Sequence, residues 1–156
     1  MKTLTIGDLK ARIPIIQGGM GVGISLSGLA SAVANEGGIG VISAAGLGLL
    51  YKKLSPSNYT EAGNLGLAEE IRKAREKAKG IIGVNVMVAL SDFAELVKTS
   101  IAEKVDIIFS GAGLPLDLPS FLKKDSVTKL VPIVSSTRAV RIICEKWKNN
   151  YDYLPD

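Results

Sequence analysis

The sequence predicts a parallel α/β barrel, of which these 156 residues hold about the first five strand-helix units. Two observations predict this fold. Short apolar runs alternate with helical patterns, which is typical of buried parallel strands joined by crossover helices. Small or polar residues also follow almost every predicted strand, and in a barrel all of these strand ends meet at one mouth.

The predicted strands end near residues 17, 44, 87, 110 and 135, within one incomplete domain that covers residues 1–156. Apolar spacing predicts helices near 27–35, 65–79, 93–101 and 119–124, and a last helix that starts after Ser136 and turns Val140, Ile143, Cys144 and Trp147 inward. The segment 46–63 is expected to be a long connection. An eight-stranded barrel typically needs about 250 residues. We therefore expect its C-terminal units to be absent.

A doubly wound open sheet is the alternative, and the chain length favours it because five strands complete such a sheet. The nucleotide-binding signatures of that fold are absent, since the sequence has neither a Gly-x-Gly-x-x-Gly motif nor a Gly-Lys pair. An open sheet would also need small residues only at its switch point. The residues at the strand ends therefore favour the barrel.

Composition excludes several partners. The formal charge is +4, but basic and acidic residues alternate, so we expect no nucleic-acid partner. The uncharged stretch 13–35 is interrupted by Pro14, Gln17 and several glycines, which indicates a strand, a loop and a helix rather than a membrane span. The single Cys144 can form no internal disulfide, so nothing calls for an oxidising compartment and we expect a cytoplasmic location. We also expect no metal site.

A glycine-rich exit follows the first predicted strand. Gly18, Gly19 and Gly21 lack side chains, so their backbone can lie against a flat ring or donate N–H bonds to it. A tight strand-to-helix turn accounts for the same glycines equally well.

Five strand-end segments together resemble those of the nitronate monooxygenases. They are Ile13-Pro-Ile-Ile-Gln-Gly-Gly-Met-Gly21, Gly37-Gly-Ile-Gly-Val-Ile-Ser43, Gly83-Val-Asn-Val-Met87, Ser110-Gly-Ala-Gly113 and Pro132-Ile-Val-Ser135. The order and spacing of the segments carry the resemblance, because each is weak alone. The FMN-dependent enoyl-acyl-carrier-protein reductases share most of these motifs.

The resemblance implies a TIM-type (β/α)8 barrel, here truncated, with FMN at its mouth. Carried over by motif, Gly18, Gly19 and Met20 would lie by the flavin ring, and Asn85 would hydrogen-bond the cofactor. Gly111 and Ala112 would form part of the wall. The alternatives are that Asn85 bonds its own backbone and that Met20 fills a gap in the core.

The implied reaction is the oxidation of an alkyl nitronate with O2 to a carbonyl compound and nitrite. The family's catalytic His lies on a sixth strand, and this sequence has no His, so we expect that residue beyond Asp156 and an inactive isolated chain. One alternative is reduction of an enoyl thioester with NAD(P)H. Another is a non-catalytic half-barrel, which self-associates or binds the missing C-terminal half through its open strand edges.

Overall fold

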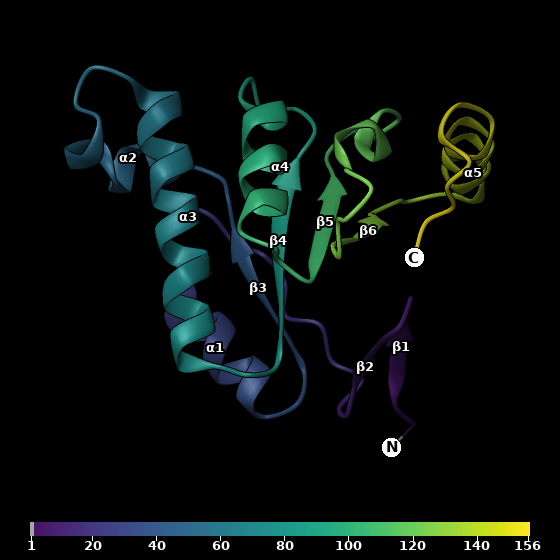
Figure 1. The fold of residues 1–156 in the computed structure, drawn as a ribbon, viewed down its shortest axis with the longest axis horizontal. Coiled ribbons are helices and arrows are strands. Elements are labelled where there is room, and N and C mark those ends of the chain that lie inside the picture. The colour runs from purple at the N-terminus through teal and green to yellow at the C-terminus, as the bar shows by residue number, and fades with distance from the viewer. Residues whose placement is uncertain (1) are drawn as a thin grey trace.

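A computed structural model describes residues 2–156, and its centre is a parallel sheet with one helix-covered face (Figure 1). The sheet contains β3 (Ile39–Ser43), β4 (Ile81–Met87), β5 (Ile107–Gly111) and β6 (Lys129–Pro132), in that spatial order. An antiparallel hairpin of β1 (Leu4–Ile6) and β2 (Leu9–Ala11) precedes it.

The connections hold helices of very different length. These are α1 (Ser27–Asn35), α2 (Leu47–Leu50), α3 (Tyr59–Lys77), α4 (Phe93–Ala102), α5 (Thr137–Tyr151) and the 3-10 turns η1 (Lys52–Leu54) and η2 (Leu118–Phe121). Side chains cap two of them: Asn58 accepts from the Glu61 amide at 3.0 Å, and Ser136 accepts from the Ala139 amide at 3.2 Å. Such caps satisfy amides that the first turn leaves without a partner.

The strand order distinguishes the two folds that the sequence left open. Neighbouring strands in the sheet are consecutive along the chain, without the reversal that defines a doubly wound sheet. Ahead of β3, the segment 13–17 runs parallel to it and forms a bridge between Ile16 and Ile39. The consecutive parallel order is that of a barrel wall.

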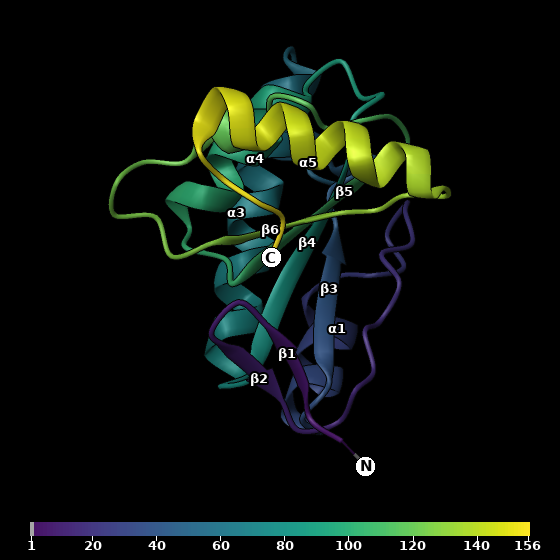
Figure 2. The same cartoon turned by 90° about the vertical axis from the view of Figure 1, so that its right-hand side faces the viewer.

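The two faces of the sheet bury different partners. Ile42, Ile82 and Ile108 point to the helices and belong to the main core. Val41, Ile107 and Phe109 alternate with them and belong to a second cluster with Ile6 and Ala11 of the hairpin. Figure 2 shows this hairpin at the amino-terminal ends of the strands. The opposite, carboxyl ends are where the predicted site residues lie.

The fold differs from the sequence prediction in several places, of which the first two lie before β4. The segment 46–63 is not one connection, because it contains α2, η1 and the start of α3. A glycine allows α2 to lie on α3: a Cβ at Gly48 would stand 2.4 Å from the Tyr59 carbonyl oxygen. The β1–β2 hairpin, which turns at Gly7 with φ of 55°, was not predicted.

None of the helices within residues 2–156 combines the length and the apolar character that crossing a membrane requires.

Candidate functional site

The first predicted strand ends at Gln17, whose side chain replaces part of a regular strand ladder. The Gln17 amide group donates to the Val41 carbonyl at 3.0 Å and accepts from the Val41 N–H at 3.1 Å. A side chain thus satisfies backbone groups of β3 that a neighbouring strand would otherwise pair with. This is why the predicted strand 13–17 is present only as a bridge.

Ser25 closes the loop that follows, Gly18–Ser25. Its side chain is buried, its hydroxyl accepts from the Met20 N–H at 2.9 Å, and it donates to the Gly18 carbonyl at 3.1 Å. The Ser25 amide also donates to the Met20 carbonyl at 3.0 Å. The loop therefore has a defined shape. Sequence reasoning missed both Gln17 and Ser25, although a polar residue on each side of a glycine run was a usable signal.

Gly19 lies directly on Asn85. A Cβ at position 19 would stand 2.5 Å from the Cβ of Asn85, which is closer than real side-chain contacts allow. Asn85 points to the same face as Phe109, its register partner on β5, and its amide nitrogen donates to the Phe109 carbonyl at 3.5 Å. Within residues 2–156 the Asn85 side-chain oxygen accepts no hydrogen bond, so most of its bonding capacity is unused.

Gly18 and Met20 face outward from this contact. A Cβ at Gly18 would meet no atom within 4 Å, and Met20 is 61% exposed. Met20 therefore fills no gap in the core that residues 2–156 form. Val22 and Ile24 of the same loop are also at least half exposed, so the loop presents an apolar surface.

Gly111 and Ala112 lie at the same end of the sheet, at the end of β5. Gly111 is the register partner of Met87, and a Cβ there would stand 2.9 Å from the Cβ of Ile133. Ala112 is exposed and has a positive φ of 54°. These two residues therefore lie one strand beyond Asn85 rather than against the Gly18–Ser25 loop.

Ser110, which precedes them, points to the opposite face. It is the register partner of Val86, a residue of the helix-side core, and its hydroxyl has no hydrogen-bond partner within residues 2–156. Its side chain therefore does not contribute to the mouth, although the sequence pattern suggested that it would.

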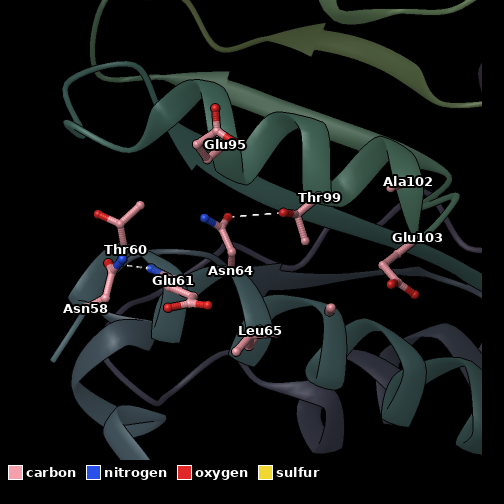
Figure 3. Close-up of a pocket in the computed structure, with 10 residues that line it drawn as sticks. Asn58, Thr60, Glu61, Asn64, Leu65, Glu95, Thr99, Ala102 and Glu103 are labelled. Atoms are coloured by element: carbon pink, nitrogen blue, oxygen red, sulfur yellow. Dashed lines mark hydrogen bonds between the residues drawn. The ribbon is translucent and has the colours of Figure 1, made fainter. Parts of the chain in front are cut away.

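Two surface hollows lie away from these strand ends. One, of about 580 Å³, lies between α3 and α4, where Thr99 donates to the Asn64 side-chain oxygen at 3.1 Å (Figure 3). Its carboxylates have local partners: Glu61 accepts from Ser55 at 2.7 Å, and Glu95 pairs with Lys98 at 2.7 Å. Glu103, the third carboxylate of this hollow, accepts from Arg72 of α3 at 2.8 Å, so each of its three carboxylates has a local partner.

The second hollow, of about 590 Å³, lies beside α4 and η2 and is lined by Lys98, Lys104 and Lys123 among others. It occurs where the connection from β5 to β6 contains only the short η2 in place of a full crossover helix. A missing helix in a barrel wall leaves such a hollow on the outside.

The residues at the mouth can bind and orient a flat molecule but supply no base. Glycine amides, the Asn85 amide group and exposed apolar side chains gather there. None of Gly18–Ser25, Asn85, Gly111 and Ala112 has an ionisable side chain, and the sequence has no His. General acid-base catalysis would need a titratable group from another part of a barrel.

Solved structures resemble the chain over most of its length. FabK from Thermotoga maritima matches with 28% identity and a TM-score of 0.64, over 85% of this chain and 37% of FabK. A point mutant of the same FabK matches with 31% identity and a TM-score of 0.67, over 85% of this chain and 39% of that one.

Nitroalkane oxidase from Streptomyces ansochromogenes matches with 16% identity and a TM-score of 0.68, over 87% of this chain and 44% of the oxidase, which supports the fold alone. The chain thus spans 37% to 44% of the length of these structures. No curated protein matches it.

The fold and the relatives agree with the resemblance seen in the sequence. The four parallel strands with their helices correspond to part of a TIM-type barrel. A family model described as nitronate monooxygenase matches residues 2–154. The chain therefore belongs to the nitronate monooxygenase family of flavin-dependent oxidoreductases.

Proposed function

We propose that residues 1–156 form the part of an FMN-dependent nitronate monooxygenase that holds the flavin ring. The observation that carries this proposal is the contact between Gly19 and Asn85 at the carboxyl ends of the strands. It brings a side-chain-free loop and an amide with unused bonding capacity to one place. Ligands of TIM-type barrels bind at that end.

The residues present fit a flavin. The Gly18 position is open on the side where a Cβ would stand, so a planar ring can approach the backbone there. Within residues 2–156 the Gly19 amide donates to no protein acceptor, so it is free to bond a ring carbonyl. Asn85 would hydrogen-bond the polar edge of the flavin ring, and Met20 would lie against the ring. Gly111 and Ala112 would complete the wall.

When bound, FMN would supply the redox chemistry, which protein side chains do not provide. In our proposal the substrates are an alkyl nitronate and O2, and the products are a carbonyl compound and nitrite. This chain's residues would bind and orient the reactants and keep water from the ring. The catalytic His and the rest of the barrel would come from polypeptide outside residues 1–156.

We further propose that the open edges of the sheet pair with that missing part or with a second copy of the chain. The segment 13–17 pairs with β3 on one edge, and β6 forms the other edge of the sheet within residues 2–156. On the β6 edge, the Asp156 side chain already accepts from the Leu130 N–H at 3.0 Å and the Asp156 N–H donates to the Leu130 carbonyl at 3.2 Å, so only the rest of that edge is open. Unpaired parallel edges favour pairing with another chain. We expect this association in the cytoplasm, without nucleic acid or membrane.

Flavin binding tests the proposal directly. The protein as its gene encodes it should purify with yellow colour, and released FMN should be identified by its chromatographic behaviour. Asn85→Ala should weaken FMN binding by about fivefold, because loss of one hydrogen bond costs about 1 kcal/mol. The matched control is Asn149→Ala, at an exposed position on α5. Equal FMN affinity of the two variants, or protein without flavin affinity, would contradict the proposal.

The second proposal is reduction of an enoyl thioester with NAD(P)H. It is favoured by the FabK structures, enoyl-acyl-carrier-protein reductases with 28% and 31% identity, against 16% for nitroalkane oxidase. Oxygen consumption with a short alkyl nitronate would support the oxygenase. Oxidation of NAD(P)H that depends on an enoyl thioester would support the reductase. Colourless protein that is inert in both assays and forms oligomers would support a non-catalytic half-barrel.

A further inference from the structure

We propose that Glu70 on α3 positions the Gly18–Ser25 loop from behind, an inference that rests on the proposed flavin role of that loop. Glu70 is buried, with only 4% of its surface exposed, and it lies outside the mouth. The evidence is that its two carboxylate oxygens bind the two elements between which the loop is held. These elements are α1 and the α2–η1 segment.

The first contact is with α1. The Glu70 Oε2 atom accepts from the Ser27 N–H at 2.6 Å, and Ser27 is the first residue of α1, two positions after the loop ends. The cap residue of α1 is Leu26, which makes no side-chain cap bond. The Glu70 carboxylate on α3 therefore caps the N-terminus of α1. Its negative charge also interacts favourably with the positive end of the helix dipole.

The second contact is with Tyr51, at the junction of α2 and η1. The Tyr51 hydroxyl donates to Glu70 Oε1. Its ring lies against α3 where Gly66 leaves room, since a Cβ at Gly66 would stand 2.5 Å from the ring carbon Cδ2. Tyr51 thereby fixes α2 on the same carboxylate.

The α2 helix in turn packs against the loop. A Cβ at Gly46, which precedes α2, would stand 2.5 Å from a methyl carbon of Val22. A Cβ at Gly23 would stand 3.3 Å from a methyl carbon of Leu50. The middle of the loop thus rests on α2 and its end continues into α1. Loss of the Glu70 contacts would release both supports.

The charge of Glu70 is maintained by its surroundings. Burial raises its pKa, but the bonds from Tyr51 and Ser27 and the charge of Lys73 outweigh burial and hold the pKa below its ordinary value. Lys73 lies 3.9 Å from Glu70 Oε1 and also pairs with Glu69 at the surface. Glu70 is therefore ionised at neutral pH and accepts from both donors.

The test compares Glu70→Gln with Glu69→Gln, which also removes a carboxylate beside Lys73 but touches neither Ser27 nor Tyr51. Hydrogen exchange should be measured at the amides of Met20, Ser25 and Ser27, and at Ile108 in β5 as a reference. We expect about tenfold faster exchange at the first three positions in Glu70→Gln only, from the usual effect of a lost cap. Exchange at Ile108 should stay unchanged.

Tyr51→Phe is the second variant, because it deletes one hydroxyl and should fold even if Glu70→Gln does not. It should accelerate exchange at Met20 and Ser25 more than at Ser27, which keeps its bond to Glu70. Unchanged loop exchange in either folded variant would overturn the proposal. So would a uniform acceleration that includes Ile108, since that would show only global destabilisation.

FMN titration of the same variants connects the result to the proposed function. Glu70→Gln should bind FMN about tenfold more weakly and alter the absorption bands of bound flavin, whereas Glu69→Gln should match the parent protein in both. If the parent protein binds no flavin, the proposed function fails while the exchange data still decide whether Glu70 positions the loop. Altered exchange with unaltered FMN binding and absorption would overturn the functional part of the inference.

Discussion

Gly19 and Asn85 are in contact so close that position 19 has no room for a side chain. The Cβ that any other residue carries would stand 2.5 Å from the Asn85 Cβ and 3.1 Å from its Cγ. By contrast, the neighbouring Gly18 faces open space. The two adjacent glycines therefore have different physical roles, and alanine substitutions should separate them.

Gly19→Ala should destabilise the fold by about 1–3 kcal/mol, because the inserted methyl group forces Asn85 or the loop to move. Gly18→Ala should leave stability within about 0.5 kcal/mol, since nothing is displaced. Urea unfolding followed by circular dichroism measures both. In our proposal Gly18→Ala should still weaken FMN binding, because the added methyl group stands where the ring approaches. Equal stability of the two variants would contradict the reported geometry.

A second glycine pair tests how α1 packs on the sheet. A Cβ at Gly40 would stand 1.8 Å from the Ala30 carbonyl oxygen, so the backbone of α1 lies directly on β3. Gly40→Ala should cost at least about 3 kcal/mol, because backbone atoms cannot move aside as a flexible side chain can.

The control for this pair is Gly28→Ala on the exposed side of α1, where a Cβ would meet nothing within 4 Å. Alanine has the higher helix propensity, so this variant should gain about 0.5–1 kcal/mol. Thermal unfolding should shift in opposite directions for the two variants. Shifts of the same sign would show that α1 does not lie on β3 as described.

The parallel sheet could be predicted from sequence because its strands are buried on both faces. Such strands are visible in the sequence as short apolar runs. The predicted range of the first helix, 27–35, is the observed range of α1, and Gly37 follows its end as a C-terminal stop. The hairpin was missed because strands of three residues are too short to show an alternating pattern. In segment 46–63 the glycines that permit close packing of α2 on α3 look the same as loop glycines in sequence.

The candidate site was predictable in part for a similar reason. Strand-end glycines and Asn85 stand out from apolar runs, so their gathering at one mouth follows from the topology. The contacts of Gln17 with Val41 and of Glu70 with Ser27 do not follow from the topology, because they join residues that are 24 and 43 positions apart in the chain. Nothing local in the sequence marks a carboxylate on α3 as the cap of α1.

The last helix gives a third prediction. Trp147 is fully buried and its indole N–H donates to the Pro115 carbonyl at 2.9 Å, whereas Val140 on the same helix is 42% exposed, against the inward orientation that its spacing predicted. Trp147→Phe should cost about 1–3 kcal/mol, because it leaves a buried carbonyl without its donor. Val140→Ala should cost less than about 0.5 kcal/mol. Urea unfolding followed by circular dichroism checks both, and similar losses would mean that α5 is not docked through Trp147.

The fourth prediction concerns alkaline pH. Burial, followed by the bond to Glu70, raises the pKa of Tyr51 to about 12. A phenol whose pKa is raised on folding stabilises the folded state below the pKa of the unfolded chain, about 10, and this contribution is lost as the pH rises through about 12. The difference in ultraviolet absorption between the parent protein and Tyr51→Phe should therefore titrate near pH 12. The parent's stability advantage over Tyr51→Phe should decline over the same range, because a phenolate beside the Glu70 carboxylate repels it. A titration midpoint near 10 would show that the Tyr51 hydroxyl is free in solution and does not bind Glu70.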